Sequence, residues 1–218
     1  MLLSAYLAAE GFRVTALEPL TPDFSWYDAL QADVLAYCAR KTITFEHVHT
    51  MVEDYIAPSR YDLVFSIHVL EHVRDPLRAL ENMYLSLKER GSLLALCPNY
   101  DVPFEPHLGI LLLGRSKVVN AKLYPRRIAA RSELWDRLVF VRYSTFRRFL
   151  ERKRIRYSFN RMMLRDMFLE LGKDELLYGR MPRALRWAYH ILDLTGAIGL
   201  LSKMPLRVQT PMELLITK

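Results

Sequence analysis

The string His68-Val69-Leu70-Glu71-His72 places two histidines four residues apart, with a carboxylate beside the second. This H-x-x-E-H spacing is typical of inverted zinc metalloproteases, in which both imidazoles project from one face of a helix toward the metal. Here, however, the buried-strand pattern YDLVFSI ends at Ile67, and Asp75-Pro76 has the residue types of a helix start. The sequence therefore predicts no metal site, and it predicts that the string forms a loop lining a cleft.

Glu18 is a second residue whose type and position could do chemistry. It directly follows the apolar segment Arg13–Leu17, which has the pattern of a short buried strand. A carboxylate at the carboxyl end of such a strand can accept both hydrogen bonds from a ribose diol. The alternative is an ordinary surface glutamate in a turn after the strand, and the position alone does not decide between them.

The elements that must position these residues alternate between helix and strand. Helices are expected over residues 2–10 and 28–40 and from Pro76 to Arg90; strands are expected over residues 13–17, 43–49, 61–67 and 92–97. Buried strands alternating with helices are typical of a Rossmann-like α/β fold, with a mostly parallel sheet and helices on both faces. In such a sheet, ligands bind outside the carboxyl ends of the strands.

The composition and the pattern of the sequence change after Asn99. Residues 100–142 hold prolines, a short apolar run and a basic segment, and are expected to form an inserted lobe that covers the cleft. Residues 143–218 contain a late helix, two strand patterns, one of them closing the sheet, and an amphipathic segment; they are expected to complete the domain begun by residues 1–99. The lobe and the late part together form a basic, largely helical addition to the core.

Three motifs in the first part of the chain resemble those of a known family. The segments VTALEP, YDLVFSIHVLEHVRDPLRAL and RGSLLALCPN resemble the class I S-adenosylmethionine-dependent methyltransferases, in particular the group that contains ubiquinone-biosynthesis methyltransferases. The resemblance covers residues 1–99 well and the remainder loosely. It implies methyl transfer from S-adenosylmethionine to a small-molecule, lipid-linked or glycan acceptor.

The resemblance also assigns residues to the cofactor by position. Glu18 would bind the ribose hydroxyls, Met51 and Val52 would flank the adenine, and Ser66, Ile67 and His68 would line the methionine end. The family often has an aspartate before the adenine-flanking pair, where this chain has Thr50. A carboxylate contact to the adenine amino group would then have to come from Glu53 or Asp54.

His72 and His107 are the candidate catalytic residues. Methyl transfer requires an oriented acceptor, and a base where that acceptor is a hydroxyl group. His72 follows the predicted cofactor loop, and His107 lies in the segment NYDVPFEPHLGI after the strand that ends before Asn99. A purely structural role is the alternative for each of them.

The chain departs from the family at its beginning. The family's first strand and its glycine-rich loop should precede the helix that begins at Leu2, and glycine is what lets a backbone approach the cofactor closely. We expect a fragment in which Met1 is an internal methionine. The alternatives are a catalytically dead, methyltransferase-like binding module and a nicotinamide-dependent enzyme that uses Glu18 for the ribose.

Charge and cysteine content bear on partners and location. The formal net charge is +7, and basic residues far outnumber acidic ones between Arg115 and Arg165, which favours an anionic partner. Residues 183–203 are apolar and basic and could contact a membrane surface or simply pack on their own domain. No nucleic-acid module is recognised.

Cys38 and Cys97 lie far apart, and residues 1–17 have no signal-peptide pattern. A cytoplasmic location is therefore expected, and membrane association is the alternative.

Overall fold

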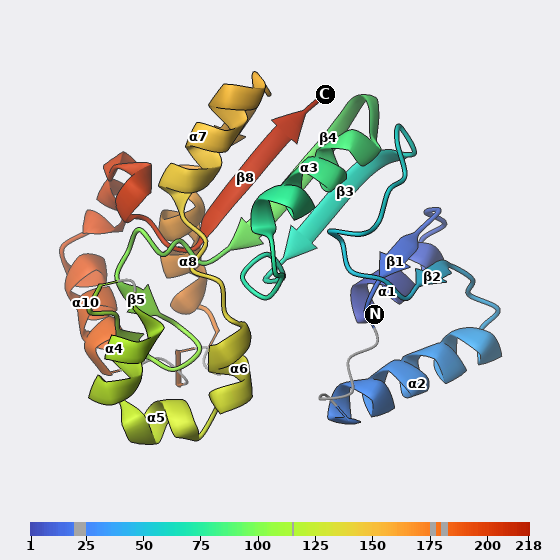
Figure 1. Ribbon diagram of the computed structural model, residues 1–218. Coiled ribbons are helices and arrows are strands. Elements are labelled where there is room, and N and C mark those ends of the chain that lie inside the picture. Colours follow the sequence, from blue (N-terminus) through green and yellow to red (C-terminus); the bar gives the residue numbers. More distant parts are fainter. Residues whose placement is uncertain (20–24, 115, 175–177, 180–182) are drawn as a thin grey trace. The chain divides into compact units, whose positions relative to one another are not determined.

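The structure is a computed structural model that describes residues 1–19, 25–114, 116–174, 178–179 and 183–218 (Figure 1). The chain divides into two compact units, Met1–Tyr55 and Ile56–Lys218. Each unit combines helices with a parallel strand pair, which confirms the predicted α/β class. The division falls inside the predicted segment 1–99, and the predicted boundaries at residues 99 and 142 stay predictions.

The described residues of the first unit form two helices and a two-stranded parallel sheet. The helices are α1 (Leu2–Ala9) and α2 (Ser25–Arg40), and the strands are β1 (Thr15–Leu17) and β2 (Glu46–Val48). Thr15 pairs with Glu46 and Leu17 with Val48. Buried Val34 and Cys38 of α2 pack with Ala5 of α1 and form the core of this unit. Both strands are shorter than predicted.

The second unit is built on a four-stranded mixed sheet with the order β3-β4-β8-β7. The strands are β3 (Tyr61–Ile67), β4 (Leu87–Cys97), β7 (Tyr157–Phe159) and β8 (Met212–Thr217). β3 and β4 are parallel, whereas β8 is antiparallel to both β4 and β7. The alternating residues Leu93, Ala95, Leu214 and Ile216 are almost fully buried. This period of two is what a sheet face packed on a core requires.

β3 differs from its predicted environment. Its continuous apolar pattern predicted a strand buried on both faces, but β3 is the edge strand of this sheet, and Leu63, Phe65 and Ile67 are 57%, 37% and 44% exposed. The apolar pattern correctly identified a strand. It could not show how many neighbours that strand has.

Helix α3 (Pro76–Ser86) begins where the sequence predicted and ends four residues early. Asp75 caps it by accepting hydrogen bonds from the backbone N–H groups of Leu77 and Arg78, both at 3.1 Å. Residues 87–90, predicted as helical, instead belong to β4, where the register with β3 shifts between Tyr61 and Leu63. The register shift lets the extra residues of β4 extend its pairing with β3. In this segment, strand pairing therefore outweighs helical propensity.

A separate small core supports the segment after β4. This segment contains β5 (Phe104–Glu105), β6 (Ile110–Leu111), α4 (Lys117–Leu123), α5 (Pro125–Ala129) and α6 (Ser132–Arg137). Buried residues of the strands and helices pack together; they are Tyr100, Ile110, Leu112, Ile128, Trp135 and Leu138. This core holds the β5–β6 turn, which carries His107, in place.

Further helices lie late in the described part of the chain. They include α7 (Tyr143–Lys153), α8 (Met163–Leu171), α10 (Arg183–Leu194) and the 3₁₀ segments η1 (Ala197–Lys203) and η2 (Leu206–Val208). The apolar and basic segment 183–203 forms two helical pieces, which are separated at Gly196, whose φ of 64° precedes η1. In the part of the chain that the structure covers, none of the helices combines the length and apolarity needed to cross a bilayer.

Candidate functional site

Glu18 lies at the carboxyl end of β1, as predicted for a ribose-binding residue. Its backbone N–H donates to the Val48 carbonyl at 3.1 Å, which continues the β1–β2 pairing by one residue. The Met1 amino group donates to Glu18 Oε1 at 2.9 Å, and the Glu18 side chain is 18% exposed. Ribose binding by Glu18 stays a prediction.

Met51 and Val52 lie in the turn after β2, where the adenine contact was predicted. The turn is closed by a hydrogen bond from the Asp54 N–H to the Met51 carbonyl at 3.0 Å, and both side chains are half-buried. Glu53, one of the two acids considered for the adenine amino group, is 2% exposed. The turn thus offers apolar side chains and a buried carboxylate, which suit an adenine ring and its amino group.

Ser66, Ile67 and His68 end β3 and lead into the loop. Ser66 is buried, and its Oγ has no hydrogen-bond partner among the described residues. His68 adopts a φ of 54° while its backbone N–H donates to the Leu96 carbonyl at 2.8 Å. Because a buried hydroxyl group normally has a partner, Ser66 Oγ is an available donor and acceptor for a polar ligand at this strand end. This fits the predicted contact with the methionine end of the cofactor.

The string from His68 to His72 is a loop, as predicted, and not a helix. A turn within it is closed by the His72 N–H, which donates to the Val69 carbonyl at 2.8 Å. His68 and His72 therefore do not share a helical face. The arrangement found in inverted zinc metalloproteases does not form here.

The two predicted catalytic histidines are brought together in the second unit. The rings of His72 and His107 lie edge to face, with centroids 5.3 Å apart and planes at 69°. Glu71 is fully buried beside them, and one ligand-capable atom from each of Glu71, His72 and His107 lies within 4.8 Å of the others. The loop after β3 and the β5–β6 turn thus converge on one polar cluster.

Glu105 fixes the position of His107 and was not predicted as a site residue. Its Oε1 lies 2.6 Å from His107 Nδ1, and its two oxygens accept the backbone N–H groups of His107 and Leu108 at 3.1 and 2.6 Å. Tyr100 donates its hydroxyl to the same Oε1 at 3.2 Å. An ionised carboxylate only accepts, so Nδ1 carries the shared proton and Nε2 of His107 remains for another partner. The acid two residues before His107, in FEPH, was the available sequence signal.

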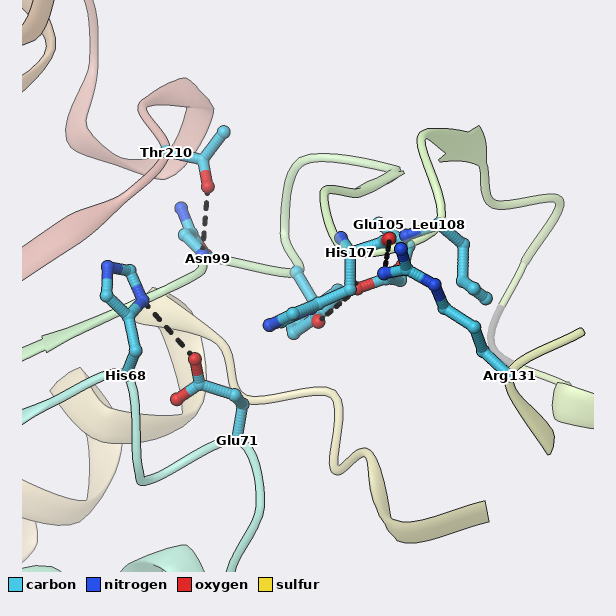
Figure 2. A network of polar contacts seen from close by, with 9 residues as sticks. His68, Glu71, Asn99, Glu105, His107, Leu108, Arg131 and Thr210 are labelled. Carbon is cyan, nitrogen blue, oxygen red and sulfur yellow. Dashed lines mark hydrogen bonds and ion pairs between the residues drawn. The ribbon is translucent and has the colours of Figure 1, made fainter. Parts of the chain in front are cut away.

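Figure 2 shows Glu105, His107 and Leu108 gathered with Arg131, which donates to the His107 carbonyl at 2.9 Å. This contact joins α5 and α6 to the β5–β6 turn from outside. The same view shows His68 facing Glu71, with Nδ1 3.4 Å from Oε1. The cluster is therefore held by polar contacts on both sides.

The pKa values of His72 and His107 are shifted in opposite directions. Burial lowers the pKa of His72, and this outweighs the nearby Glu71 carboxylate. The hydrogen bond that His107 donates to Glu105 raises the pKa of His107 against the effect of burial. Burial by itself would raise the pKa of Glu105, but its hydrogen bonds from His107 and from the Leu108 N–H lower it overall. One imidazole is thus kept neutral, and the other is oriented by an anion.

Asn99, at the end of β4, has a structural role. It is fully buried, and its side-chain amide donates to the carbonyls of Leu206, Arg207 and Gln209 at 3.4, 3.1 and 2.9 Å. Its Oδ1 accepts the backbone N–H groups of Asp101 and Tyr143, both at 3.0 Å. Its own backbone N–H donates to Thr210 Oγ1 at 3.1 Å (Figure 2). Asn99 ties the strand end to α7 and to the segment before β8.

Comparison with protein families and with other sequences gives matches along most of the chain. A family model described as a methyltransferase domain matches residues 2–172. An uncharacterised protein of Mycobacterium tuberculosis is 30% identical over 226 residues, which cover 100% of this chain and 75% of that protein. A ubiquinone biosynthesis O-methyltransferase of Rickettsia bellii is 28% identical over 93 residues, which cover 41% of this chain and 35% of that enzyme.

A solved structure resembles the fold of this chain. It is phosphoethanolamine N-methyltransferase 2 of Haemonchus contortus, in complex with S-adenosyl-L-methionine, and it matches with a TM-score of 0.51. The sequence identity is 13%, and the match covers 98% of this chain and 45% of that one. At this identity the likeness concerns the fold alone.

Proposed function

The chain belongs to the family of methyltransferase domains, and from this premise we propose that it transfers a methyl group from S-adenosylmethionine to a hydroxyl oxygen of a small acceptor. S-adenosylmethionine supplies a methyl group on a positively charged sulfur. The residues of the chain then have to hold the cofactor, exclude water and orient the acceptor oxygen in line with the methyl carbon. The matches cover 75% of the M. tuberculosis relative and 35% of the R. bellii relative. Because neither relative is covered in full, the acceptor is inferred from the chain's own residues.

The cofactor contacts follow from the strand ends. Glu18 would accept hydrogen bonds from the ribose, Met51 and Val52 would enclose the adenine, and the Ser66 hydroxyl would meet the methionine end. Glu18 directly follows β1, Met51 and Val52 lie in the turn after β2, and Ser66 is the penultimate residue of β3. All of these groups are thus near the carboxyl ends of strands in parallel pairs, where ligands bind in open α/β sheets. Ile67 and His68 would line the same end of the cofactor through their backbone.

The observation that carries the choice of an oxygen acceptor is the His72–His107 pair next to Glu71. A hydroxyl group has to lose its proton as it is methylated, and imidazole nitrogens are suited to receive or direct that proton. Glu105 engages Nδ1 of His107, which leaves Nε2 toward other partners. The R. bellii relative is named as an O-methyltransferase, which agrees with this choice.

The test is methyl transfer by purified protein, followed as formation of S-adenosylhomocysteine with a panel of hydroxyl-bearing acceptors. Replacing His107 with alanine is expected to lower kcat by about 100-fold or more, because general acid–base groups contribute that much. The dissociation constant for S-adenosylhomocysteine should stay unchanged, since His107 is not among the proposed cofactor contacts.

His190→Ala is the matched control, because His190 is an exposed histidine of α10 whose Nε2 is 2.6 Å from the Tyr178 hydroxyl. Its activity should equal that of the unmodified chain. Binding of S-adenosylhomocysteine without turnover of any acceptor would favour a binding module over an enzyme. Full activity in His107→Ala would contradict the proposed role of the histidine pair.

A lipid-linked acceptor is supported by the late part of the chain. Trp187, Ile191 and Leu194 fall on one face of α10 and are 71%, 46% and 90% exposed. Lys203, at the end of η1, and Arg207, in η2, are exposed and basic. An apolar face combined with nearby cations fits the surface of an anionic bilayer, where the apolar side chains would enter the boundary of the acyl chains.

Co-sedimentation with vesicles tests this surface. The chain is expected to bind vesicles rich in phosphatidylglycerol better than neutral phosphatidylcholine vesicles. Replacing both Trp187 and Leu194 with serine should weaken binding at least about tenfold, given the apolar area that each side chain would bury. Leu111→Ser, which removes a leucine that is 63% exposed on β6, should leave binding unchanged. Equal loss in both variants, or no binding to either vesicle, would argue against a bilayer contact.

A further inference from the structure

Glu71, His72 and His107 combine the ligand types and the spacing of a metal centre. A carboxylate and two imidazoles approach within 4.8 Å of one another in the second unit. We propose that these three side chains bind one divalent transition-metal ion of the zinc type, and that this ion holds the acceptor hydroxyl. The inference rests on the proposed function and refines it, because the two imidazoles would act through the ion that they bind, in place of receiving the acceptor proton themselves.

Glu71 has the burial and the charge expected of a cation ligand. The residue is fully buried, and neither carboxylate oxygen has a hydrogen-bond partner among the described residues. His68 Nδ1 lies 3.4 Å from Oε1, on a side chain that is half exposed. A buried carboxylate without compensation is costly, and buried charges are normally paired or coordinate metals. A divalent ion beside Glu71 would supply this compensation.

The environment of His107 fits a metal ligand. Histidines that bind metals usually donate their second ring N–H to a carboxylate, which fixes the tautomer and the ring orientation. Glu105 Oε1 provides this contact at 2.6 Å from Nδ1, and Tyr100 and two backbone N–H groups hold Glu105 in turn. The lone pair of Nε2 is thereby kept available. His72 lies with its ring edge to face against that of His107, so its imidazole enters the same space.

The three ligand atoms have to move only a short distance to bind one ion. Ligand atoms about 2.1 Å from a tetrahedral zinc ion lie about 3.4 Å apart, so atoms within 4.8 Å of one another have to approach by at most about 1.4 Å. Rotation of side chains provides movements of this size. Two histidines and one glutamate are also the ligand set of catalytic zinc sites that keep the fourth position open for water or substrate.

This ligand set differs from the one suggested by the H-x-x-E-H string. The string would pair His68 with His72 on a helix, whereas the proposed site takes Glu71 and His72 from a loop and adds His107 from a distant turn. The sequence predicted no metal site, and the proposal departs from that prediction. The difference arises because the folded β5–β6 turn brings in a ligand that linear spacing does not reveal.

The chemistry balances without an oxidant or reductant. The acceptor hydroxyl binds the open position of the ion, and its O–H bond breaks with the proton passing to solvent. The oxygen then forms a bond to the methyl carbon while the carbon–sulfur bond breaks, with its electron pair going to sulfur. The products are a methyl ether and the neutral thioether of the cofactor.

The test is metal binding by the whole chain. Titration of the chelator-treated protein with Zn²⁺, followed by calorimetry, is expected to show one ion per chain, and Co²⁺ should give the visible absorption of a tetrahedral site. Glu71→Gln, His72→Ala and His107→Ala should each weaken binding by at least about tenfold. His49→Ala is the control, since His47 and His49 form another close pair, with ring centroids 4.0 Å apart, and should not matter. Circular dichroism identifies any variant that fails to fold. If Glu71→Gln is such a variant, the His72→Ala and His107→Ala variants decide the result, because both histidines are only half-buried.

The outcomes separate this inference from the proposed function. If the chelated protein binds no metal yet forms S-adenosylhomocysteine at full rate, the metal site is wrong and the methyl transfer stands. If one ion binds and the three variants weaken its binding, the site is supported even where no acceptor is methylated. Binding that only His49→Ala removes would place the ion elsewhere and overturn the inference.

Discussion

Replacing Glu105 with glutamine is expected to lower kcat for methyl transfer by about 10- to 100-fold, the range found when partners that orient a metal-binding histidine are removed. The carboxylate accepts from four donors, among them Nδ1 of His107 and the hydroxyl of Tyr100. A glutamine amide must turn its NH₂ group toward some of these donors, which leaves His107 without a fixed orientation. KM for S-adenosylmethionine should stay unchanged, because Glu105 is not among the proposed cofactor contacts.

Two measurements distinguish this positioning role from a general loss of structure. The ¹⁵N chemical shifts of the His107 ring should indicate a single tautomer in the unmodified chain and a mixture of tautomers in Glu105→Gln. The backbone amide signals of β4 and β8 should stay the same in both. Glu133→Gln, at an exposed position of α6 in the same lobe, provides the matched substitution and should leave kcat unchanged. A variant at Glu105 that kept both full kcat and a single His107 tautomer would show that the contact does not orient the ring.

Replacing Asn99 with aspartate should destabilise the second unit by about 4 kcal/mol or more, although the two side chains have nearly the same shape. The amide donates to three carbonyl oxygens, and an aspartate would place an oxygen against all three. Each buried acceptor left unsatisfied costs about 1–3 kcal/mol, and the new buried charge adds to this. Urea unfolding followed by tryptophan fluorescence measures the change as a lower midpoint.

Asn82→Asp is the comparison for this variant. Asn82 lies at a partly exposed position of α3, where a charge remains in contact with water, so the substitution should cost less than about 0.5 kcal/mol. Similar midpoints for the two variants would mean that the Asn99 contacts contribute little to stability. Loss of the contacts should also loosen the start of α7, because Asn99 Oδ1 accepts the backbone N–H of Tyr143.

Local patterns predicted much of the fold because they depend on nearby residues only. Asp75-Pro76 predicted the start of α3, since capping and a fixed φ are local properties, and YDLVFSI predicted β3 to the residue. The resemblance to class I methyltransferases is confirmed by the family match over residues 2–172. The loop from His68 to His72 was likewise predicted from its flanking elements.

What the sequence could not show depends on contacts between distant segments. The end of α3 is decided by pairing of residues 87–90 with β3 and with Lys218, whose carbonyl accepts the Arg90 N–H at 2.9 Å. The cluster of Glu71 with His107 requires the folded β5–β6 turn. Glu105 was missed because its importance lies in contacts with Tyr100 and the turn backbone, which residue type alone does not indicate.

The position of β8 has a consequence for how the chain folds. Residues 212–217 form an inner strand between β4 and β7, and Asn99 contacts residues 206–210, more than a hundred positions away in sequence. A ribosome has to synthesise nearly all of these 218 residues before the sheet can be completed. Until then β4 presents an unpaired apolar edge, and contacts over such sequence distances form slowly. The nascent chain is thus expected to depend on chaperones at the stage when β4 has been made and β8 has not.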